Sequence, residues 1–403
     1  MCGRNRGWPF CLRLKSKVPA TKNTNKRKCE EFRAGNSKWR GLLMKRQLFA
    51  GLVAGTFAVC GHAESSVTLY GILDTAIEFT NHWPTSPTQS AATGNRWAMA
   101  DGARSGGSRW GLTGNEDLGG GLKAEFQLED GFLVHNGHLM QEFFGRSAWI
   151  GLTSPKAGTL RFGRQYTSLV DALYPSSPTD LSGTYEPVVA EVGANLWESN
   201  VVKYKNSFGP VTLIGHYSFS NLAGQFSNGS GYGGAASYDN GTVSVSVGYD
   251  NLHRADGVGS SYARFEKAAI GVTYSTAALK LMGGYRYGKN DPLAGYAARD
   301  DYFWAAARYL FAVDKILTIA YYYDRIRTAT GVNGEVTRPA SPQQVMAIGD
   351  YLLSKRTDLY VVVGYSRHSA LNFDSYNGTS AAYRTASADS SQTGVQIGVR
   401  HSF

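Results

Sequence analysis

Cysteine is missing from most of this chain. All four cysteines, Cys2, Cys11, Cys29 and Cys60, lie within the first 60 residues, so residues 64–403 contain none. A chain without thiols forms neither a disulfide framework nor a thiolate metal site. If it is exported, it also crosses an oxidising compartment without the risk of wrong disulfides.

Long hydrophobic runs are missing as well. The longest, Leu48–Val59, has about a dozen residues, whereas a helix that spans a bilayer needs about 20. After it, no stretch approaches the ~18 apolar residues of a transmembrane helix. Lipid admits only helices and closed barrels, because every backbone polar group must be satisfied there. If this chain spans a membrane, it does so as a β-barrel.

The apolar run belongs to a leader. It follows a start at Met44 with two cations and precedes the small residues Gly61 and Ala63, which is the order of a secretory signal peptide. We expect a signal peptide at 44–63, cleaved after Ala63; the alternative, a membrane anchor, needs a longer run. Residues 1–43 show no hydrophobic periodicity and are expected to be an extension from a wrongly assigned start, with a true cytoplasmic extension as the alternative.

An excess of one charge sign is confined to that leader. The whole chain has 41 Lys and Arg against 31 Asp and Glu, a formal net charge of +10. Residues 1–43 hold twelve of the basic residues and two of the acidic ones, and 64–403 keeps 27 basic and 29 acidic residues. Because the expected mature chain is nearly neutral, the basic surface that nucleic acid requires is absent. We expect no nucleic-acid partner.

Period-two alternation is abundant from Ser65 onward, in a chain with 48 glycines and 24 tyrosines. In the segment 121–130, Leu122, Ala124, Phe126 and Leu128 alternate with Lys123, Glu125, Gln127 and Glu129. One face of such a strand is apolar and the other is polar, as in a transmembrane barrel. Aromatic residues recur near the strand ends, where interface girdles would lie, although β-propensity alone also favours them.

Blocks of this kind recur sixteen times. The predicted strands are 65–80, 103–115, 120–131, 143–153, 157–166, 199–208, 210–219, 232–238, 241–251, 262–274, 277–287, 302–311, 315–325, 343–353, 356–367 and 392–403. Seven short turns alternate with eight longer connections, as in outer-membrane barrels with short periplasmic turns and long outer loops. A soluble sandwich, the alternative, has no reason to alternate them. The sequence predicts an all-β, 16-stranded antiparallel transmembrane barrel over 64–403.

Several strings in this order resemble the trimeric general porins of Gram-negative outer membranes, of the beta-proteobacterial type. They are SSVTLYGILDTA, SRWGLTGNEDLGGGLKAEFQLEDGF, FGRSAWIGL, GTLRFGRQY, SNVVKYKNSFGPV and GVQIGVRHSF, and they span essentially all of 65–403. The resemblance implies a homotrimer in the cell outer membrane, in contact with membrane lipid and lipopolysaccharide. It also implies a water-filled pore for passive diffusion of ions and small hydrophilic solutes.

The resemblance further implies that the third loop folds inward and narrows the pore. Segment 167–199 is the longest internal connection and contains acids but no Lys or Arg. A loop this long is uncommon unless it is functional. The expected pore-facing acids are Asp180 and Glu186, with Asp171 and Glu191 as further candidates.

By the same resemblance, Arg109, Arg146 and Lys205 form a basic wall across from the loop, and Lys203 shares the polar face of Lys205. Alternation supports this: Arg109 alternates with Trp110 and Leu112, Arg146 with Ser147 and Trp149, and Lys205 with Val202 and Tyr204. A cation facing lipid at mid-depth would cost about 2–4 kcal/mol, which favours the lumen. Acids opposite bases would create a transverse field that biases ion selectivity. The alternative is that each charge merely solvates a wide lumen.

Phe403 ends the last predicted strand on the face of Val395, Ile397 and Val399. The resemblance implies that it is an assembly signal read by the barrel-insertion machinery. Alternatively, or in addition, it is the last lipid-facing residue.

Catalytic motifs are missing from the expected mature chain. The seven histidines after residue 63 are scattered, and no HExxH, GxSxG or phosphate loop occurs there. We expect no enzyme, no cofactor and no metal, since a barrel hydrolase would need a nucleophile with a placed base. Two other functions remain open: a substrate-selective channel with a saturable site, and a surface adhesin or receptor with a plugged lumen.

Overall fold

The computed structural model describes residues 65–85, 93–102, 107–193, 196–224, 226–255, 262–290, 297–330, 334–373, 383–385 and 391–403. The predicted signal peptide and the extension before it lie outside these residues. Across the described ranges, no helix has the length and apolar character needed to cross a membrane.

Sixteen long strands form one antiparallel sheet in which each strand pairs with the next, and all sixteen were predicted. They are β1 (Ser66–Pro84), β3 (Ser108–Gly119), β4 (Leu122–Phe132), β5 (Ser147–Ser154), β6 (Gly158–Tyr166), β7 (Trp197–Phe208), β8 (Val211–Ser218), β9 (Gly231–Asp239), β10 (Val243–Ala255), β11 (Tyr262–Ser275), β12 (Leu279–Asn290), β13 (Ala297–Ala312), β14 (Lys315–Thr330), β16 (Gln343–Leu352), β17 (Thr357–Arg367) and β18 (Ser391–Ser402).

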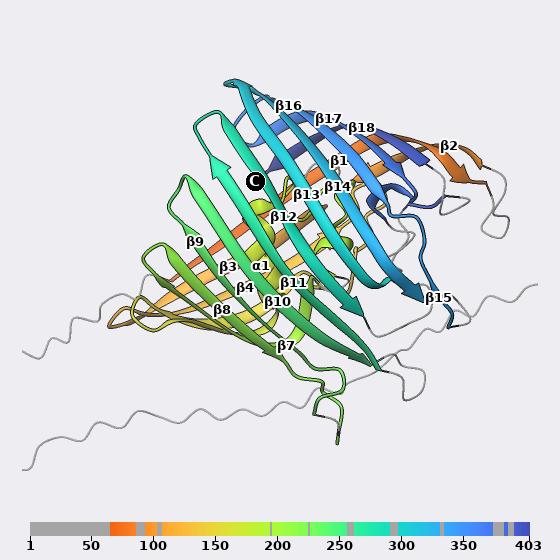
Figure 1. The fold of residues 1–403 in the computed structure, drawn as a ribbon. Coiled ribbons are helices and arrows are strands. Elements are labelled where there is room, and N and C mark those ends of the chain that lie inside the picture. The colour runs from red at the N-terminus through yellow and green to blue at the C-terminus, as the bar shows by residue number, and fades with distance from the viewer. Residues whose placement is uncertain are drawn as a thin grey trace, which may run out of the picture. The chain divides into compact units, whose positions relative to one another are not determined.

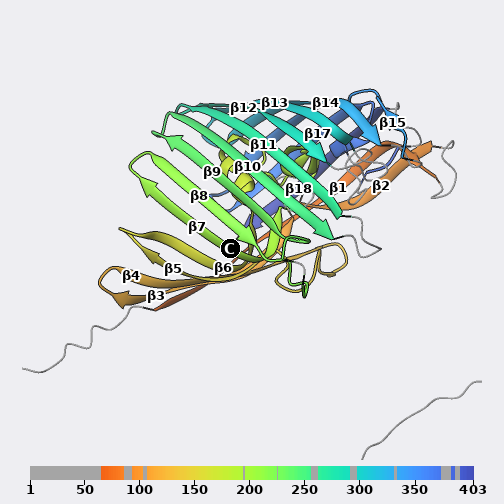
Figure 2. The ribbon, with the colours of Figure 1, turned by 60° about the horizontal axis from the view of Figure 1, so that its bottom comes forward.

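The sheet closes on itself because its last strand pairs with its first. The register of β18 against β1 runs from Ile72 opposite Ser402 to Thr80 opposite Gly394. Figures 1 and 2 show the strands as a continuous wall around a central space, with the helical segment α1 inside it. Closure leaves no sheet edge exposed, as lipid requires.

Two further strands were not predicted. β2 (Thr93–Asp101) pairs with the second half of β1, from Thr75 opposite Asp101 onward. β3 pairs with the first half of β1, along the same edge. β15 (Val336–Thr337) pairs with the end of β14. Both lie in segments predicted to be loops. β2 continues the edge of β3 within the wall, since β1 from Thr75 to Thr80 pairs with β2 on one side and with β18 on the other. β15 lengthens the hairpin that follows β14.

The two faces of the wall differ as alternation predicted. Large apolar side chains are exposed on the outward face, for example Ile77, Ile150 and Ile397, each 62% exposed. Polar side chains such as Asp74 and Gln396 are buried on the inward face. A continuous exposed apolar belt is not compatible with water, so the outward face contacts lipid and the inward face surrounds an aqueous lumen.

The short connections all lie at one end of the barrel, together with the two ends of the barrel domain. The turn between β3 and β4 shows why glycine is needed there: Gly119, Gly120 and Gly121 have φ angles of 87°, 63° and 82°. This left-handed region is accessible to glycine at little cost. The long connections lie at the other end.

Candidate functional site

The connection between β6 and β7, called the inner loop below, is folded and buried. It contains α1 (Ser168–Leu173), a 3-10 turn η1 (Tyr174–Ser176) and α2 (Val188–Val192). The side chain of Thr167 caps α1 by accepting a hydrogen bond from the amide of Val170. Apolar side chains of the loop, including Leu169 and Tyr185, are fully buried.

Side chains from the inward face of distant strands hold the first half of this loop. Trp304 Nε1 on β13 donates to the carbonyl of Ser176 at 2.9 Å. Thr273 Oγ1 on β11 donates to the carbonyl of Pro175 at 3.0 Å. These bonds satisfy loop carbonyls that have no sheet partner, and they fix the turn η1 against the wall.

The second half of the loop reaches β1 and β16 and also returns to β11. The hydroxyl of Tyr185 donates to Glu78 Oε1 on β1 at 2.9 Å, and Gln344 on β16 donates to the carbonyl of Tyr185. Lys267 Nζ on β11 donates to the carbonyl of Ala190 at 3.2 Å. The inner loop therefore lies across the space that the wall encloses (Figure 1).

Glycines on the inward face of the strands allow the inner loop to pack closely against the wall. A Cβ atom on Gly248 would lie 2.9 Å from Leu169 Cδ1, and one on Gly271 would lie 2.9 Å from Ser176 Cβ. A Cβ atom on Gly364 would lie 2.9 Å from the Tyr185 ring. Because real Cβ contacts do not come this close, only glycine allows α1, η1 and Tyr185 to approach the strands.

The predicted basic residues Arg109 and Arg146 meet at one carboxylate. Arg146 Nε lies 2.6 Å from Glu129 Oε1, and Arg109 Nε lies 3.7 Å from Glu129 Oε2. The Arg146 guanidinium also lies over the ring of Trp197, 4.9 Å from its centroid. Two guanidinium groups therefore share the Glu129 carboxylate at this part of the wall.

The alternation argument for Arg146 was wrong in one respect. Ser147 and Trp149 face inward rather than outward, and Trp149 Nε1 donates to Gln127 Oε1 at 3.1 Å. Arg146 precedes β5 and reaches Glu129 from the rim, where its amide also donates to the Glu129 carbonyl at 3.3 Å. Its side chain is inward because the strand has not yet begun, so the alternation rule does not apply to it.

The structure separates Lys203 from Lys205. Lys203 is almost fully buried and forms an ion pair of 2.7 Å with Asp171 of α1. Lys205 is exposed, and its partner in the register is Thr159 at the start of β6, near the short-turn end. Lys203 therefore pins the inner loop, whereas Lys205 lies outside the cluster of Arg109, Arg146 and Glu129.

Among the four predicted acids, only Asp171 and Asp180 are partly exposed. Glu186 and Glu191 are fully buried, so the prediction that they present carboxylates to the pore was wrong. Glu186 accepts hydrogen bonds from the hydroxyls of Ser177 and Thr179, because the loop folds around it. Burial raises the pKa of Glu186, and burial together with repulsion from Glu186 raises the pKa of Glu191.

Tyr174 is a residue that the sequence did not point to. It lies in η1, and its side chain is 45% exposed. Partial burial and the nearby Asp180 carboxylate raise the pKa of Tyr174 to about 12, and the positive charges of Arg109 and Arg146 oppose that rise. Tyr174 thus lies within electrostatic range of both the loop acid and the basic wall. A single tyrosine in a loop carries no pattern by which it could have been found.

Arg161 was missed although alternation marks it as inward. Its Nη2 lies 3.3 Å from Glu125 Oε1, and its guanidinium lies 4.0 Å from the centroid of the Trp149 ring. In the pairs Arg109–Glu129, Arg161–Glu125, Arg400–Asp358 and Arg96–Glu78, the arginine is more exposed than its acid. The difference is largest in the Arg96–Glu78 pair, where the arginine side chain is 36% exposed and the glutamate side chain is 3% exposed.

No group of three or more His, Cys, Asp or Glu side chains could hold a metal ion within the described ranges.

Comparison with known proteins agrees with this architecture. The family model described as Gram-negative porin matches residues 50–371. An outer membrane porin protein of Bordetella pertussis is 30% identical over 411 residues, covering 89% of this chain and 100% of that protein. Outer membrane porin protein 32 of Delftia acidovorans is 27% identical over 379 residues, with the same coverage.

Solved structures match as well. The anion-selective porin from Comamonas acidovorans superposes with a TM-score of 0.66 at 25% identity, over 84% of this chain and 100% of that one. OmpT of Vibrio cholerae superposes with a TM-score of 0.60 at 16% identity, over 84% and 98%. The protein belongs to the Gram-negative porin family and is an outer-membrane channel for passive diffusion of ions and small hydrophilic solutes.

Proposed function

We propose that this channel prefers anions, and that the wall around Arg109 and Arg146 sets the preference. The observation that carries the proposal is the sharing of the Glu129 carboxylate by two guanidinium groups. An ion at this level of the lumen meets two guanidinium groups gathered around one carboxylate. Chloride is attracted and potassium is repelled, because charged side chains that line a pore select by sign.

The exposure of the Arg109–Glu129 pair supports the same direction. Arg109 is 20% exposed and Glu129 is 9% exposed, so a passing ion approaches the cation more closely than the acid. The Coulomb energy falls with distance, and water screens the deeper charge further. The Arg109–Glu129 pair therefore presents its positive charge nearer to the water than its negative charge.

The inner loop supplies the other side of the constriction in this proposal. Asp180 and Tyr174 lie on the loop, within electrostatic range of one another. The partly exposed Asp180 carboxylate and the Arg109 guanidinium both act on Tyr174, and a field between these opposite charges would orient dipolar solutes. The solved relative from Comamonas, described as anion-selective, has the same fold at 25% identity.

A salt-gradient recording in a planar bilayer tests the proposal. With a tenfold KCl gradient across the membrane, we expect a reversal potential of the sign that chloride permeation produces. A potential of the opposite sign, or one of zero, would contradict it. Absence of any conductance would instead favour a plugged receptor barrel, and block by one solute class at low concentration would favour a substrate-selective channel.

We also propose that the mature protein is a homotrimer of residues 64–403. The proposed start follows from the signal peptide expected at 44–63. A trimer form of the V. cholerae protein OmpT has been solved, and it shares the fold of this chain. Native mass spectrometry of protein purified from outer membranes should give three copies of a chain that begins at Glu64. A monomer, or a chain that retains the leader, would contradict this.

Phe403 is proposed to act in assembly. Its amide donates to the carbonyl of Gly71 at 3.0 Å, and the amide of Gly71 donates back at 3.2 Å. Its ring covers Gly71, since a Cβ there would lie 2.8 Å from Phe403 Cε1. Deletion of Phe403 removes both of these hydrogen bonds together with the terminal aromatic ring. We expect it to lower the yield of folded barrel in the outer membrane severalfold, measured by the gel shift between heated and unheated samples.

The matched control for this prediction is Phe403→Tyr, which keeps both backbone bonds and the ring. It should assemble like the native protein. Phe403→Ala separates the two contributions, because it retains the backbone bonds and loses only the ring. Native yield after deletion would contradict an assembly role.

A further inference from the structure

Charged side chains are buried where α2 of the inner loop packs against strands β11 to β14. The group, called the α2 cluster below, has one charged residue on each of the four strands and two on the loop, none more than 6% exposed: Lys267, Arg286, Asp300, Asp324, Glu186 and Glu191. Charges this deep are only weakly screened by water. Their signs and partners therefore strongly affect how firmly α2 is held against the wall.

The two bases of the α2 cluster hold the loop by its backbone. Lys267 Nζ donates to the carbonyl of Ala190 at 3.2 Å, and Arg286 Nη2 donates to the same carbonyl. Arg286 also donates to the carboxylate of Asp300, and Asp324 Oδ2 lies 4.0 Å from Arg286 Nη2. Both bases are therefore engaged by α2 and by the acids of the wall.

Glu191 has no comparable contacts. Its side chain is fully buried, and neither carboxylate oxygen has a hydrogen-bond partner within the described ranges. The hydroxyls of Tyr302 and Tyr322 lie within electrostatic range of Glu191, and they too have no hydrogen-bond partner there. An ionised carboxylate without hydrogen bonds is so costly in a dry site that it binds a proton instead.

The charges around Glu191 do not offset that cost. Burial is the largest cause that raises the pKa of Glu191, repulsion from Glu186 adds to it, and attraction by Arg286 opposes it. Within the α2 cluster the acids outnumber the bases by four to two. Arg299 also acts on Asp300, but it is 28% exposed and pairs with Asp301. A proton on Glu191 reduces the excess of buried negative charge.

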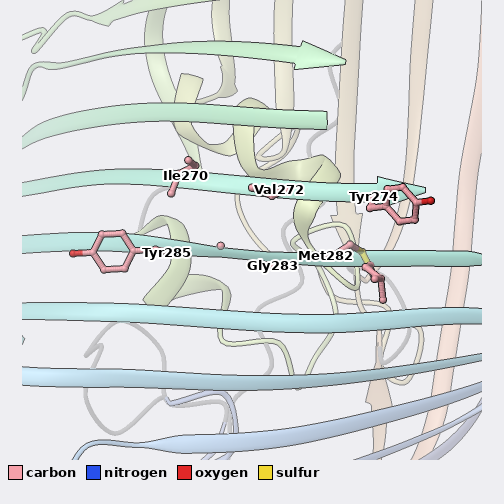
Figure 3. Close-up of a pocket in the computed structure, with 8 residues that line it drawn as sticks. Ile270, Val272, Tyr274, Met282, Gly283 and Tyr285 are labelled. Atoms are coloured by element: carbon pink, nitrogen blue, oxygen red, sulfur yellow. The ribbon is translucent and has the colours of Figure 1, made fainter. Parts of the chain in front are cut away.

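The wall separates the α2 cluster from the lipid. Lys267 and Arg286 face inward, whereas residues of the opposite parity on β11 and β12, among them Ile270, Val272 and Tyr285, line an apolar groove on the outward face (Figure 3). On the lumen side, the inner loop covers the cluster. Glu191 therefore meets water when α2 leaves the wall.

We propose that the inner loop is a pH-responsive gate, in which α2 stays against the wall while Glu191 carries a proton and rising pH favours its release. The docked state binds a proton that the released state, with Glu191 in water, gives up. Linkage then lowers the docking equilibrium constant by up to tenfold for each unit of pH, from the ordinary range of glutamate up to the raised pKa of docked Glu191. High pH favours the released loop.

Glu186 titrates in a lower range. Burial raises the pKa of Glu186 to about 7, although hydrogen bonds from Thr179 and Ser177 lower it. Above about pH 8, Glu186 is mostly ionised whether the loop is docked or released, so it adds little further pH dependence there. The response that we assign to Glu191 is therefore measured above that pH.

Single-channel recordings of the purified channel in symmetrical KCl, at pH values from about 6 to about 10, test the proposal. The native channel should show a second level of higher conductance, because the inner loop lies across the lumen. The ratio of time spent in the higher level to time in the lower level should rise with pH, by up to tenfold for each unit. Glu191→Gln keeps a neutral group of similar shape, so its ratio should stay constant above about pH 8. The matched control, Glu142→Gln in an exposed loop, should respond like the native channel.

Thiol labelling provides an independent measure, since the expected mature chain has no cysteine. Val192→Cys places one thiol at a position of α2 that is 4% exposed. At about pH 9, this thiol should react with iodoacetamide at least about tenfold faster in the native background than in the Glu191→Gln background. Ionisation of the thiol does not affect the comparison, because both rates are measured at one pH.

Equal labelling rates in the two backgrounds would overturn the proposal. So would a pH response that persists in Glu191→Gln, which would assign it to other members of the α2 cluster, or a native conductance that does not change with pH. These outcomes do not depend on the anion preference proposed above, because conductance in symmetrical salt does not report the sign of selectivity.

Discussion

Replacement of both Arg109 and Arg161 with glutamate should reverse the sign of the potential that the channel develops in a KCl gradient. Each substitution exchanges a lumen cation for an anion, next to Glu129 and Glu125 respectively. A unit charge acts on an ion about 4 Å away with about 1 kcal/mol even in bulk water. Two reversals therefore suffice to change the ratio of chloride to potassium permeability by at least about tenfold.

The matched control is Lys355→Glu with Arg356→Glu, which makes the same change in formal charge in an exposed turn. It should leave the reversal potential close to the native value. Arg146 is left intact, because a glutamate there would place a second carboxylate against Glu129 in a nearly dry site. An unchanged reversal potential in the lumen variant, with native barrel yield, would exclude this wall as the source of selectivity.

Replacement of Gly248 and Gly271 with leucine should dislodge the inner loop and raise single-channel conductance. Either leucine would overlap α1 or η1, since even a Cβ atom would lie 2.9 Å from Leu169 or Ser176. Overpacking of this kind costs about 1–3 kcal/mol at each site. The loop is held by individual hydrogen bonds and the Lys203–Asp171 pair, so we expect it to yield before the closed sheet does.

The control for this variant is Gly215→Leu on β8. Gly215 faces outward, and a Cβ atom there meets nothing within 4 Å. The Gly215→Leu channel should have the conductance of the native channel. The yield of folded barrel should be equal for this control and for the variant with leucine at positions 248 and 271. A native conductance after both inward substitutions would indicate that the inner loop does not limit ion flow.

The fold could be predicted because the membrane imposes a simple rule on each strand. In β4, Phe126 and Leu128 alternate with Glu125 and Gln127, and lipid and water enforce that alternation along the whole chain. β2 was missed because its nine residues follow turn-rich sequence and were taken for part of the loop between β1 and β3.

The direction in which a site residue points could be predicted only for residues that lie on strands. Arg109 follows from alternation, since Trp110 beside it faces outward. Glu186 was misplaced because its burial depends on Ser177 and Thr179 folding around it, and Tyr174 was missed because its position depends on how η1 meets the wall. Loop packing has no period from which it could be inferred.

The seam between β1 and β18 makes closure of the barrel depend on a complete chain. Gln396 hydrogen-bonds Glu78, which lies 318 positions earlier, so the wall cannot close until the last strand has been made. Bringing such distant segments together costs about 5 kcal/mol in loop entropy, which only the finished seam returns. A product that stops short of β18 leaves the edges of β1 and β17 facing lipid, where every unmatched backbone group is costly. We therefore expect prematurely terminated copies to form no stable barrel in the membrane.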